Sequence, residues 1–145
     1  MLKKMKIAIV GSRDFDDYDL LKRMMKAYLQ IGITLIISGG AKGADELAKR
    51  WSKEFLEQEP KIIRPNWKDI SQHDAVIKQD DKGNKYDARA GLRRNELIAQ
   101  QADLLVAFWD GKSKGTKQVI LYAQQIGKDV KIVKYKEAAQ LKLPF

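Results

Sequence analysis

The sequence contains no cysteine, a single histidine and no apolar run long enough to cross a bilayer. Without cysteine the chain can form neither a disulfide framework nor a thiolate metal site, and His73 alone offers little to a zinc ion. A membrane-spanning helix needs about 20 apolar residues, and the lysine-containing start leads straight into a strand pattern instead of a signal-peptide core. We therefore expect a cytosolic protein with no metal, no cofactor and no membrane partner.

The residues that are present are typical of one globular domain. The chain has 145 residues, of which 44% are hydrophobic and 32% are charged. A chain of this length can bury most of its apolar surface around one core, and its composition is not that of a disordered segment. We therefore expect a single domain over residues 1–145.

Positive charge exceeds negative charge, with a formal net charge of +9. Much of the excess lies in residues 111–145, which contain eight lysines and only two acidic residues. Such an excess favours nucleic acid or another anionic partner. The alternative is that scattered lysines only solvate a surface, since this stretch has no arginine cluster and few aromatic residues.

Five short apolar runs predict the strands of a sheet. They lie at residues 7–10, 33–37, 62–63, 104–108 and 130–133, and most of them show no polar alternation. Continuous apolar strands suit a parallel sheet that is buried on both faces.

Between these runs lie apolar stripes with helical spacing, at residues 21–28, 47–55 and 119–126, and Gly127 follows the last one in a position suited to a helix C-cap. Strands alternating with helices predict an α/β, Rossmann-like, doubly wound fold. We expect a mainly parallel sheet of about five strands with helices on both faces. In such sheets ligands bind at the carboxyl ends of the strands, where the strand order reverses.

Residues 68–89 do not fit this pattern, because they are polar and have no sustained period. A long segment of this kind in a small domain is usually functional or mobile. We interpret it as a flexible insertion, either a flap or disordered. Asp80 and Asp81 are read as solvated turn residues and not as metal ligands.

Three loops after predicted strands carry small and polar residues suited to a phosphate group. Residues 11–15 read GSRDF, residues 38–45 read SGGAKGAD, and residues 109–116 read WDGKSKGT. Glycines let the backbone approach a ligand, and amide groups at the start of a helix bind anions. None of these loops has the GxGxxG or Walker A spacing. The structural alternatives are a tight turn at Gly11, close strand–helix packing at the second loop, and a helix N-cap at Thr116.

Two further places contribute candidates. Residues 90–95 read AGLRRN and begin a predicted helix. Arg94 or Asn95 could reach back from this helix toward the pocket expected between the glycine-containing loops. The alternative is that Arg94 is an ordinary surface arginine beside Glu96. Trp67 is a candidate base contact or a core aromatic residue. The predicted ligand-binding residues are Gly11, Ser12, Arg13, Ser38, Gly39, Gly40, Ala41, Lys42, Gly43, Asp45, Trp67, Arg94, Asn95, Asp110, Gly111, Ser113, Gly115 and Thr116.

Several short motifs follow one another along the chain and together form one pattern. They are GSR at 11–13, SGGAxGAD at 38–45, PxW at 65–67, AGxxRN at 90–95, and VAF at 106–108 followed by GT at 115–116. This pattern resembles the YspA/YpsA-related branch of the SLOG superfamily and covers nearly the whole chain apart from residues 68–89 and the tail. SLOG domains are Rossmann-like and resemble DNA-processing protein A and the LOG phosphoribohydrolases. The resemblance implies a pocket for a nucleotide or nucleotide-derived ligand and an expectation of homo-oligomers.

Three functions remain open. The first is binding or sensing of a nucleotide-like small molecule, with phosphate on the glycine loops and Arg13 and Arg94 neutralising its charge. The second is N-glycosidic hydrolysis of a nucleotide, with Asp45 or Asp110 as the catalytic carboxylate. Here the sequence departs from the LOG pattern, whose glutamate shortly after the Gly-Thr pair is absent after Thr116. The third is a single-stranded DNA-binding module that resembles DNA-processing protein A.

Overall fold

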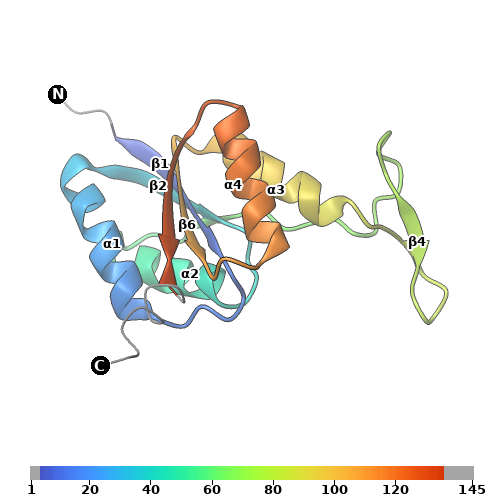
Figure 1. Cartoon of the computed structure of the whole chain (residues 1–145), viewed down its shortest axis with the longest axis horizontal. Coiled ribbons are helices and arrows are strands. Elements are labelled where there is room, and N and C mark those ends of the chain that lie inside the picture. Colours follow the sequence, from blue (N-terminus) through green and yellow to red (C-terminus); the bar gives the residue numbers. More distant parts are fainter. Residues whose placement is uncertain (1–3, 136–145) are drawn as a thin grey trace.

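A five-stranded parallel sheet forms the centre of the protein, in a computed structural model that describes residues 4–135 (Figure 1). The predicted domain ends at residues 1–3 and 136–145 lie outside the described residues, and so do two of the lysines counted in the basic segment. The strand order is β3-β2-β1-β6-β7, and every neighbouring pair is parallel. The strands are β1 (Met5–Gly11), β2 (Ile33–Ser38), β3 (Lys61–Ile62), β6 (Leu104–Trp109) and β7 (Asp129–Lys134). The predicted fold class is therefore confirmed.

Each face of the sheet is covered by two helices. Helices α1 (Tyr18–Ile31) and α2 (Ala44–Phe55) pack on one face, and α3 (Ala90–Gln101) and α4 (Lys114–Gln125) pack on the other. The alternation of β1 divides the core: Ile7 and Ile9 join the cluster under α1 and α2, whereas Ala8 and Val10 join the cluster under α3 and α4. Because both faces are covered, every β1 position from 7 to 10 is apolar and buried.

Local sequence signals fix the ends of several helices. The Asp17 carboxylate accepts the Leu20 amide at the start of α1. Gly127, with φ of +80°, follows the end of α4, and its amide bonds to the carbonyl of Gln124. The N-cap of α4 is Ser113, whose hydroxyl accepts the Thr116 amide. The alternative that Thr116 itself caps α4 was therefore wrong, because the helix begins at Lys114, two residues before it.

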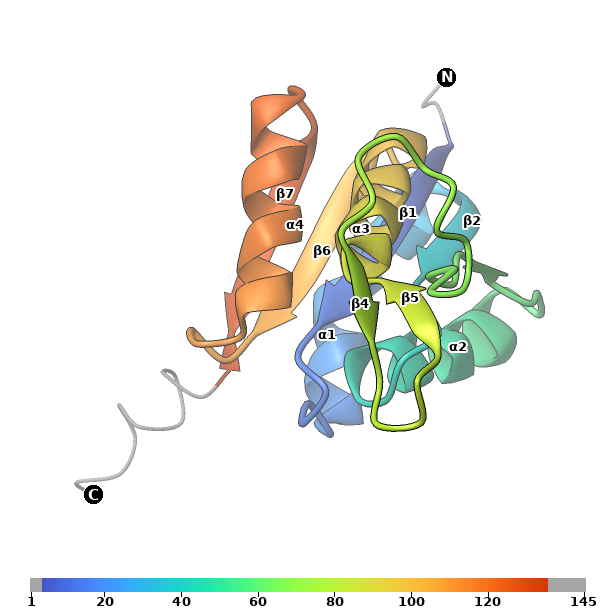
Figure 2. The ribbon, with the colours of Figure 1, turned by 90° about the vertical axis from the view of Figure 1, so that its right-hand side faces the viewer.

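The segment at residues 68–89 contains a two-stranded antiparallel hairpin, β4 (Ile77–Gln79) and β5 (Lys85–Asp87). This hairpin projects from the sheet domain beyond α3 (Figure 1), and Figure 2 shows it in front of α3 when the molecule is turned by 90°. At its tip, Asp80 accepts the amides of Lys82 and Asn84. Asp80 is thus an exposed turn residue, as predicted from the sequence.

The strand order reverses between β1 and β6. The chain moves outward from β1 to β2 and β3, then returns to the other side of β1 through β6 and β7. The loops that leave β1 and β6 therefore diverge at their carboxyl ends and leave space between them. Within residues 4–135, no helix has the length and apolar character that a membrane span requires.

Candidate functional site

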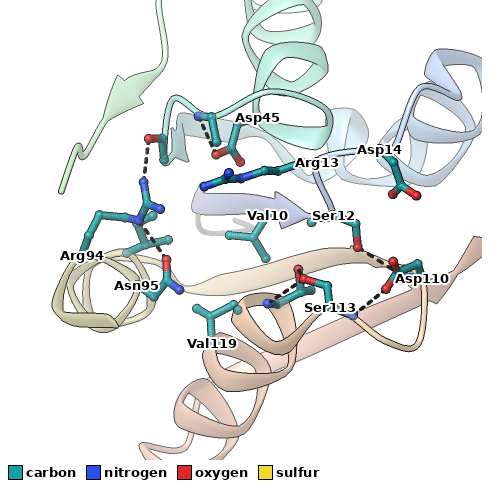
Figure 3. A pocket seen from close by; sticks show the side chains of 16 residues that line it. Val10, Ser12, Arg13, Asp14, Asp45, Arg94, Asn95, Asp110, Ser113 and Val119 are labelled. Atoms are coloured by element: carbon teal, nitrogen blue, oxygen red, sulfur yellow. Dashed lines mark hydrogen bonds between the residues drawn. The ribbon is translucent and has the colours of Figure 1, made fainter. Parts of the chain in front are cut away.

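A pocket of about 480 Å³ lies at this reversal point, at the carboxyl ends of β1, β2 and β6 (Figure 3). Its walls come from the loops after these strands and from the start of α3. The loops that were expected to face one hollow therefore do so. The predicted residues that line it are Gly11, Ser12, Arg13, Gly39, Ala41, Asp45, Arg94, Asn95, Asp110, Ser113, Gly115 and Thr116.

The first loop leaves β1 at Gly11, where the backbone is packed against its neighbours. A Cβ atom at this position would lie 2.7 Å from the Cβ of Ala44 and closer still to the carbonyl oxygen of Phe108. Ser12 is buried, and its hydroxyl accepts the Asp110 amide at 3.3 Å, which links the loops after β1 and β6. Arg13 is exposed, and its side chain extends over the pocket (Figure 3).

The second loop connects β2 to α2 and contacts the first. Gly43 has φ of +76°, and a Cβ atom there would lie 2.5 Å from the Ser12 carbonyl oxygen. The same carbonyl accepts the Ala44 amide at 3.3 Å. Because a side chain at position 43 would separate the two loops, this glycine is required by both its conformation and its surroundings.

Asp45, in the first turn of α2, stabilises the second loop. Its carboxylate accepts the Ala41 amide at 2.9 Å and is almost fully buried. Burial raises the pKa of Asp45, although the Ala41 amide, the Arg94 guanidinium and the Ser38 hydroxyl each oppose that rise.

The third loop, between β6 and α4, folds around Asp110. One oxygen of this carboxylate accepts the amides of Lys112 at 2.8 Å and Ser113 at 2.7 Å. The Ser113 amide is the main cause that holds the pKa of Asp110 below its ordinary value, while nearby Asp14 opposes the effect. Asp110 therefore has a structural task in its own loop before any contact with a ligand.

Arg94 reaches the pocket from the first turns of α3. Its guanidinium donates to the Gly39 carbonyl at 2.7 Å and to the side-chain oxygen of Asn95 at 2.9 Å (Figure 3). Burial lowers the pKa of Arg94, Asp45 opposes the lowering, and the positive charge of Arg13 adds to it. Two guanidinium groups from different elements are therefore close enough to repel each other at one end of the pocket.

Six predicted residues do not line the pocket. Ser38 is buried at the end of β2, Gly40 lies against Arg64 and Ile62, and Lys42 is exposed. Gly43 packs against the first loop, Gly111 occupies an open turn with φ of +85°, and Trp67 lies beside the hairpin. The prediction that these residues bind a ligand in this pocket finds no support in their positions.

Four lining residues were not predicted. Val10, Ile98 and Val119 form an apolar part of the wall, and Asp14 lies at the end near Asp110. In the sequence, these three apolar residues could be recognised only as members of the hydrophobic core. Asp14 was passed over although it follows Arg13 directly; its carboxylate accepts the Tyr135 hydroxyl. Within residues 4–135, no group of three or more histidine, aspartate and glutamate residues is arranged to hold a metal ion.

Comparisons with known proteins point in one direction. The family model described as DNA recombination-mediator protein A matches residues 1–142. Gene 61 protein of Mycobacterium phage D29 is 30% identical over 98 residues, which cover 64% of this chain and 66% of the phage protein, just under two thirds of its length. DNA processing protein A from Helicobacter pylori, described for its single-stranded DNA binding mode, aligns with a TM-score of 0.62 at 18% identity. That alignment covers 94% of this chain and 72% of the other, and it shows a shared fold.

Proposed function

Because this chain belongs to the DNA recombination-mediator protein A family, we propose that it binds single-stranded DNA and holds a backbone phosphate in the pocket between β1 and β6. A relative with the same fold is described as binding single-stranded DNA. The net charge of +9 favours a polyanionic partner.

The observation that carries this proposal is the pairing of Arg13 and Arg94 at one end of the pocket. Burial and the charge of Arg13 lower the pKa of Arg94, while the Asp45 carboxylate opposes this lowering. A phosphate beside the two arginines would be attracted to each of them, and planar guanidinium groups suit phosphate oxygens. The arginine end of the pocket thus favours an anion, although the carboxylates of Asp14, Asp45 and Asp110 also line the pocket.

The surrounding backbone adds to this preference. Helices α2 and α4 both begin at the rim of the pocket, at Ala44 and Lys114. The amide groups and the positive dipole end of a helix N-terminus stabilise negative charge. The apolar wall of Val10, Ile98 and Val119 offers a surface to a sugar or base beside the phosphate.

Binding is favoured over N-glycosidic hydrolysis by what the two candidate carboxylates do. Asp45 accepts the Ala41 amide, and Asp110 accepts two amides of its own loop. Both groups therefore shape the pocket. Hydrolysis would require one of them to activate water or to stabilise an oxocarbenium-like transition state instead.

The test is fluorescence anisotropy with a labelled oligothymidylate at several salt concentrations. We expect Arg13→Gln to weaken binding and to reduce the slope of log K against log salt concentration by about 0.7, the value for one phosphate contact with a single strand. Lys49→Gln is the matched control, because Lys49 is an exposed cation of α2 that does not line the pocket. Absence of binding even at low salt, or equal losses in both variants, would contradict the proposal.

A free nucleotide is the second candidate ligand. The pocket volume of about 480 Å³ lies within the range of small-molecule sites, and Asp14 and Asp110 supply acceptors for hydroxyl groups at the end opposite the arginines. A nucleoside monophosphate at 100 times its Kd should stabilise the protein by about 2.7 kcal/mol. Thermal unfolding should show this stabilisation for the unmodified chain and not for Arg13→Gln. No stabilisation by any nucleotide, together with oligonucleotide binding, would leave DNA as the ligand.

A further inference from the structure

A second hollow, away from the pocket, lies between Trp67 and the hairpin and reaches the hairpin turn. Its volume is about 780 Å³, and it is lined by Trp67, Lys68, Lys85 and Tyr86 together with Asp80 and Asn84 of the turn. We call Trp67, Lys68, Lys85 and Tyr86 the hairpin surface. Trp67 is 43% exposed, so a large part of its ring is accessible to a partner. Lysines beside an exposed aromatic ring are the combination that proteins use to bind single-stranded nucleic acid, with bases on the ring and phosphates on the cations.

The hairpin surface is held in place by a buried carboxylate. Asp87, at the end of β5, is fully buried and accepts the amides of Val76 and Arg89 and the guanidinium of Arg93. The Asp87 amide in turn donates to the Trp67 carbonyl at 2.7 Å. Since Arg93 belongs to α3, these bonds connect the hairpin and Trp67 to the helix that carries Arg94.

Trp67 also packs directly on α3. A Cβ atom at Gly91 would lie 3.1 Å from the indole ring, so the glycine leaves room for the ring to lie against the helix. One side of the ring therefore rests on the protein while a large part of it faces solvent. A ring supported in this way loses little conformational entropy when a base stacks on it.

A third, smaller hollow lies between the pocket and the segment that leads to Trp67. It has a volume of about 180 Å³, shares Arg94 with the pocket, and includes Arg64, Pro65 and Asn66, which directly precede Trp67 in the chain. Arg64 lies beside the second loop, where its guanidinium donates to the Gly40 carbonyl at 3.4 Å. Arg94 and Arg64 thus lie on the way from the pocket to Trp67 and Lys68, with Asp69 as an acidic residue beside them.

We propose that single-stranded DNA whose phosphate lies between Arg13 and Arg94 continues past Arg64 and stacks a base on Trp67, while Lys68 and Lys85 contact its phosphates. This inference rests on the proposed function and extends it from one phosphate site to a track several nucleotides long. The hairpin then determines how much affinity the protein gains from a longer strand.

The experiment measures affinity for oligothymidylates of 3 to 12 nucleotides. For the unmodified chain, affinity rises with length once the strand reaches the hairpin. Trp67→Leu removes roughly a five- to hundredfold gain from the longer strands and leaves the shortest strand unaffected, whereas Trp67→Phe keeps most of the gain because it keeps a stacking ring. The control is Phe55→Leu, since Phe55 is 41% exposed but lines a different hollow between α1 and α2.

A second variant keeps the proposal testable if Trp67→Leu does not fold. Lys68→Gln/Lys85→Gln changes two exposed residues and reduces the salt slope for the longer strands by about 1.4, or 0.7 for each lost contact. Intrinsic fluorescence gives an independent signal. Long strands quench a tryptophan signal that is lost in Trp67→Phe, whereas the buried Trp51 and the half-buried Trp109 are present in both proteins, so the quenching that the variant loses comes from Trp67.

The two proposals fail in different ways. If no strand binds and Arg13→Gln changes nothing, the proposed function is wrong and this inference falls with it. If Arg13→Gln weakens binding but the Trp67 and lysine variants bind every length like the unmodified chain, the track is wrong and only the phosphate pocket stands. A hairpin that serves a protein partner would give this second result.

Discussion

Replacing Gly43 by alanine should be far more costly than the same replacement at a glycine with a similar φ. Both Gly43 and Gly127 have positive φ, at +76° and +80°. They differ in their surroundings: a Cβ atom at Gly127 meets nothing within 4 Å, whereas one at Gly43 lies 2.5 Å from the Ser12 carbonyl oxygen. The pair therefore compares a positive φ in open space with a positive φ at the contact between the first two loops of the pocket.

The expected free energies follow from these two terms. An alanine at Gly127 has only the strain of a left-handed conformation, about 1–2 kcal/mol. An alanine at Gly43 has strain of about 1–3 kcal/mol, and a further 1–3 kcal/mol, roughly, for moving the loops apart. We expect losses of about 1 kcal/mol for Gly127→Ala and about 4 kcal/mol for Gly43→Ala.

Urea unfolding measures this difference. With a slope of about 2 kcal/mol per molar urea, the midpoint of Gly43→Ala should lie about 1.5 M below that of Gly127→Ala. Both variants should remain folded without urea, since domains have about 5–15 kcal/mol of stability. Equal midpoints would refute the reasoning, because they would mean that the loop after β1 does not press against Gly43.

Two further predictions concern pH. The Arg93 guanidinium and backbone amides hold the pKa of Asp87 below its ordinary value of 3.8. The stabilisation by the Asp87 carboxylate is therefore complete above pH 3.8 and is lost as the pH falls through the lower pKa of the folded state. Urea midpoints between pH 6 and 2.5 should change less in Asp87→Asn than in the exposed hairpin control Asp81→Asn. Burial raises the pKa of Asp45 above 3.8, so the carboxyl becomes charged as the pH rises through this raised pKa, and both the stability of the protein and its affinity for an anion should fall over that range. Anisotropy at constant ionic strength should show this fall in affinity for the unmodified chain and not for Asp45→Asn. The same pH profile in both proteins would contradict the prediction.

The centre of the sheet was predictable from sequence because β1 and β6 are buried on both faces. The apolar runs at residues 7–10, 33–37 and 104–108 lie within β1, β2 and β6. Once these strands are parallel, their following loops must meet at one edge, so the convergence of the glycine loops also followed from the sequence. The predicted relation to SLOG proteins and DNA-processing protein A is confirmed by the family match over residues 1–142.

The hairpin was not predictable, and the reason is physical. Each of its strands has three residues, too few to show an alternating pattern, and most of their side chains are exposed. What holds the hairpin is the pairing of buried Asp87 with Arg93, six residues further on and in another element. In the sequence, Asp87 and Arg93 look like any solvent-exposed charged residues. Only the folded chain shows that Asp87 is buried.

The individual roles of pocket residues were only partly accessible from sequence for a similar reason. Arg13 and Arg94 were recognised as cations near a loop, but only the fold brings both to one pocket, where the charge of Arg13 lowers the pKa of Arg94. The apolar wall residues could be assigned only to the core. Sequence patterns identify chemical groups, whereas the electrostatics of a site depends on distances that the tertiary fold sets.

In the proposed phosphate site, the two arginines therefore have different parts. Arg94 is already oriented by the Gly39 carbonyl and by Asn95, so it gives up little rotamer freedom when a phosphate arrives. Arg13 is exposed, so its side chain must be ordered by the ligand and its charge is more strongly screened by salt. If a phosphate binds in this pocket as proposed, Arg94 determines where it lies, and Arg13 determines much of how the affinity responds to ionic strength.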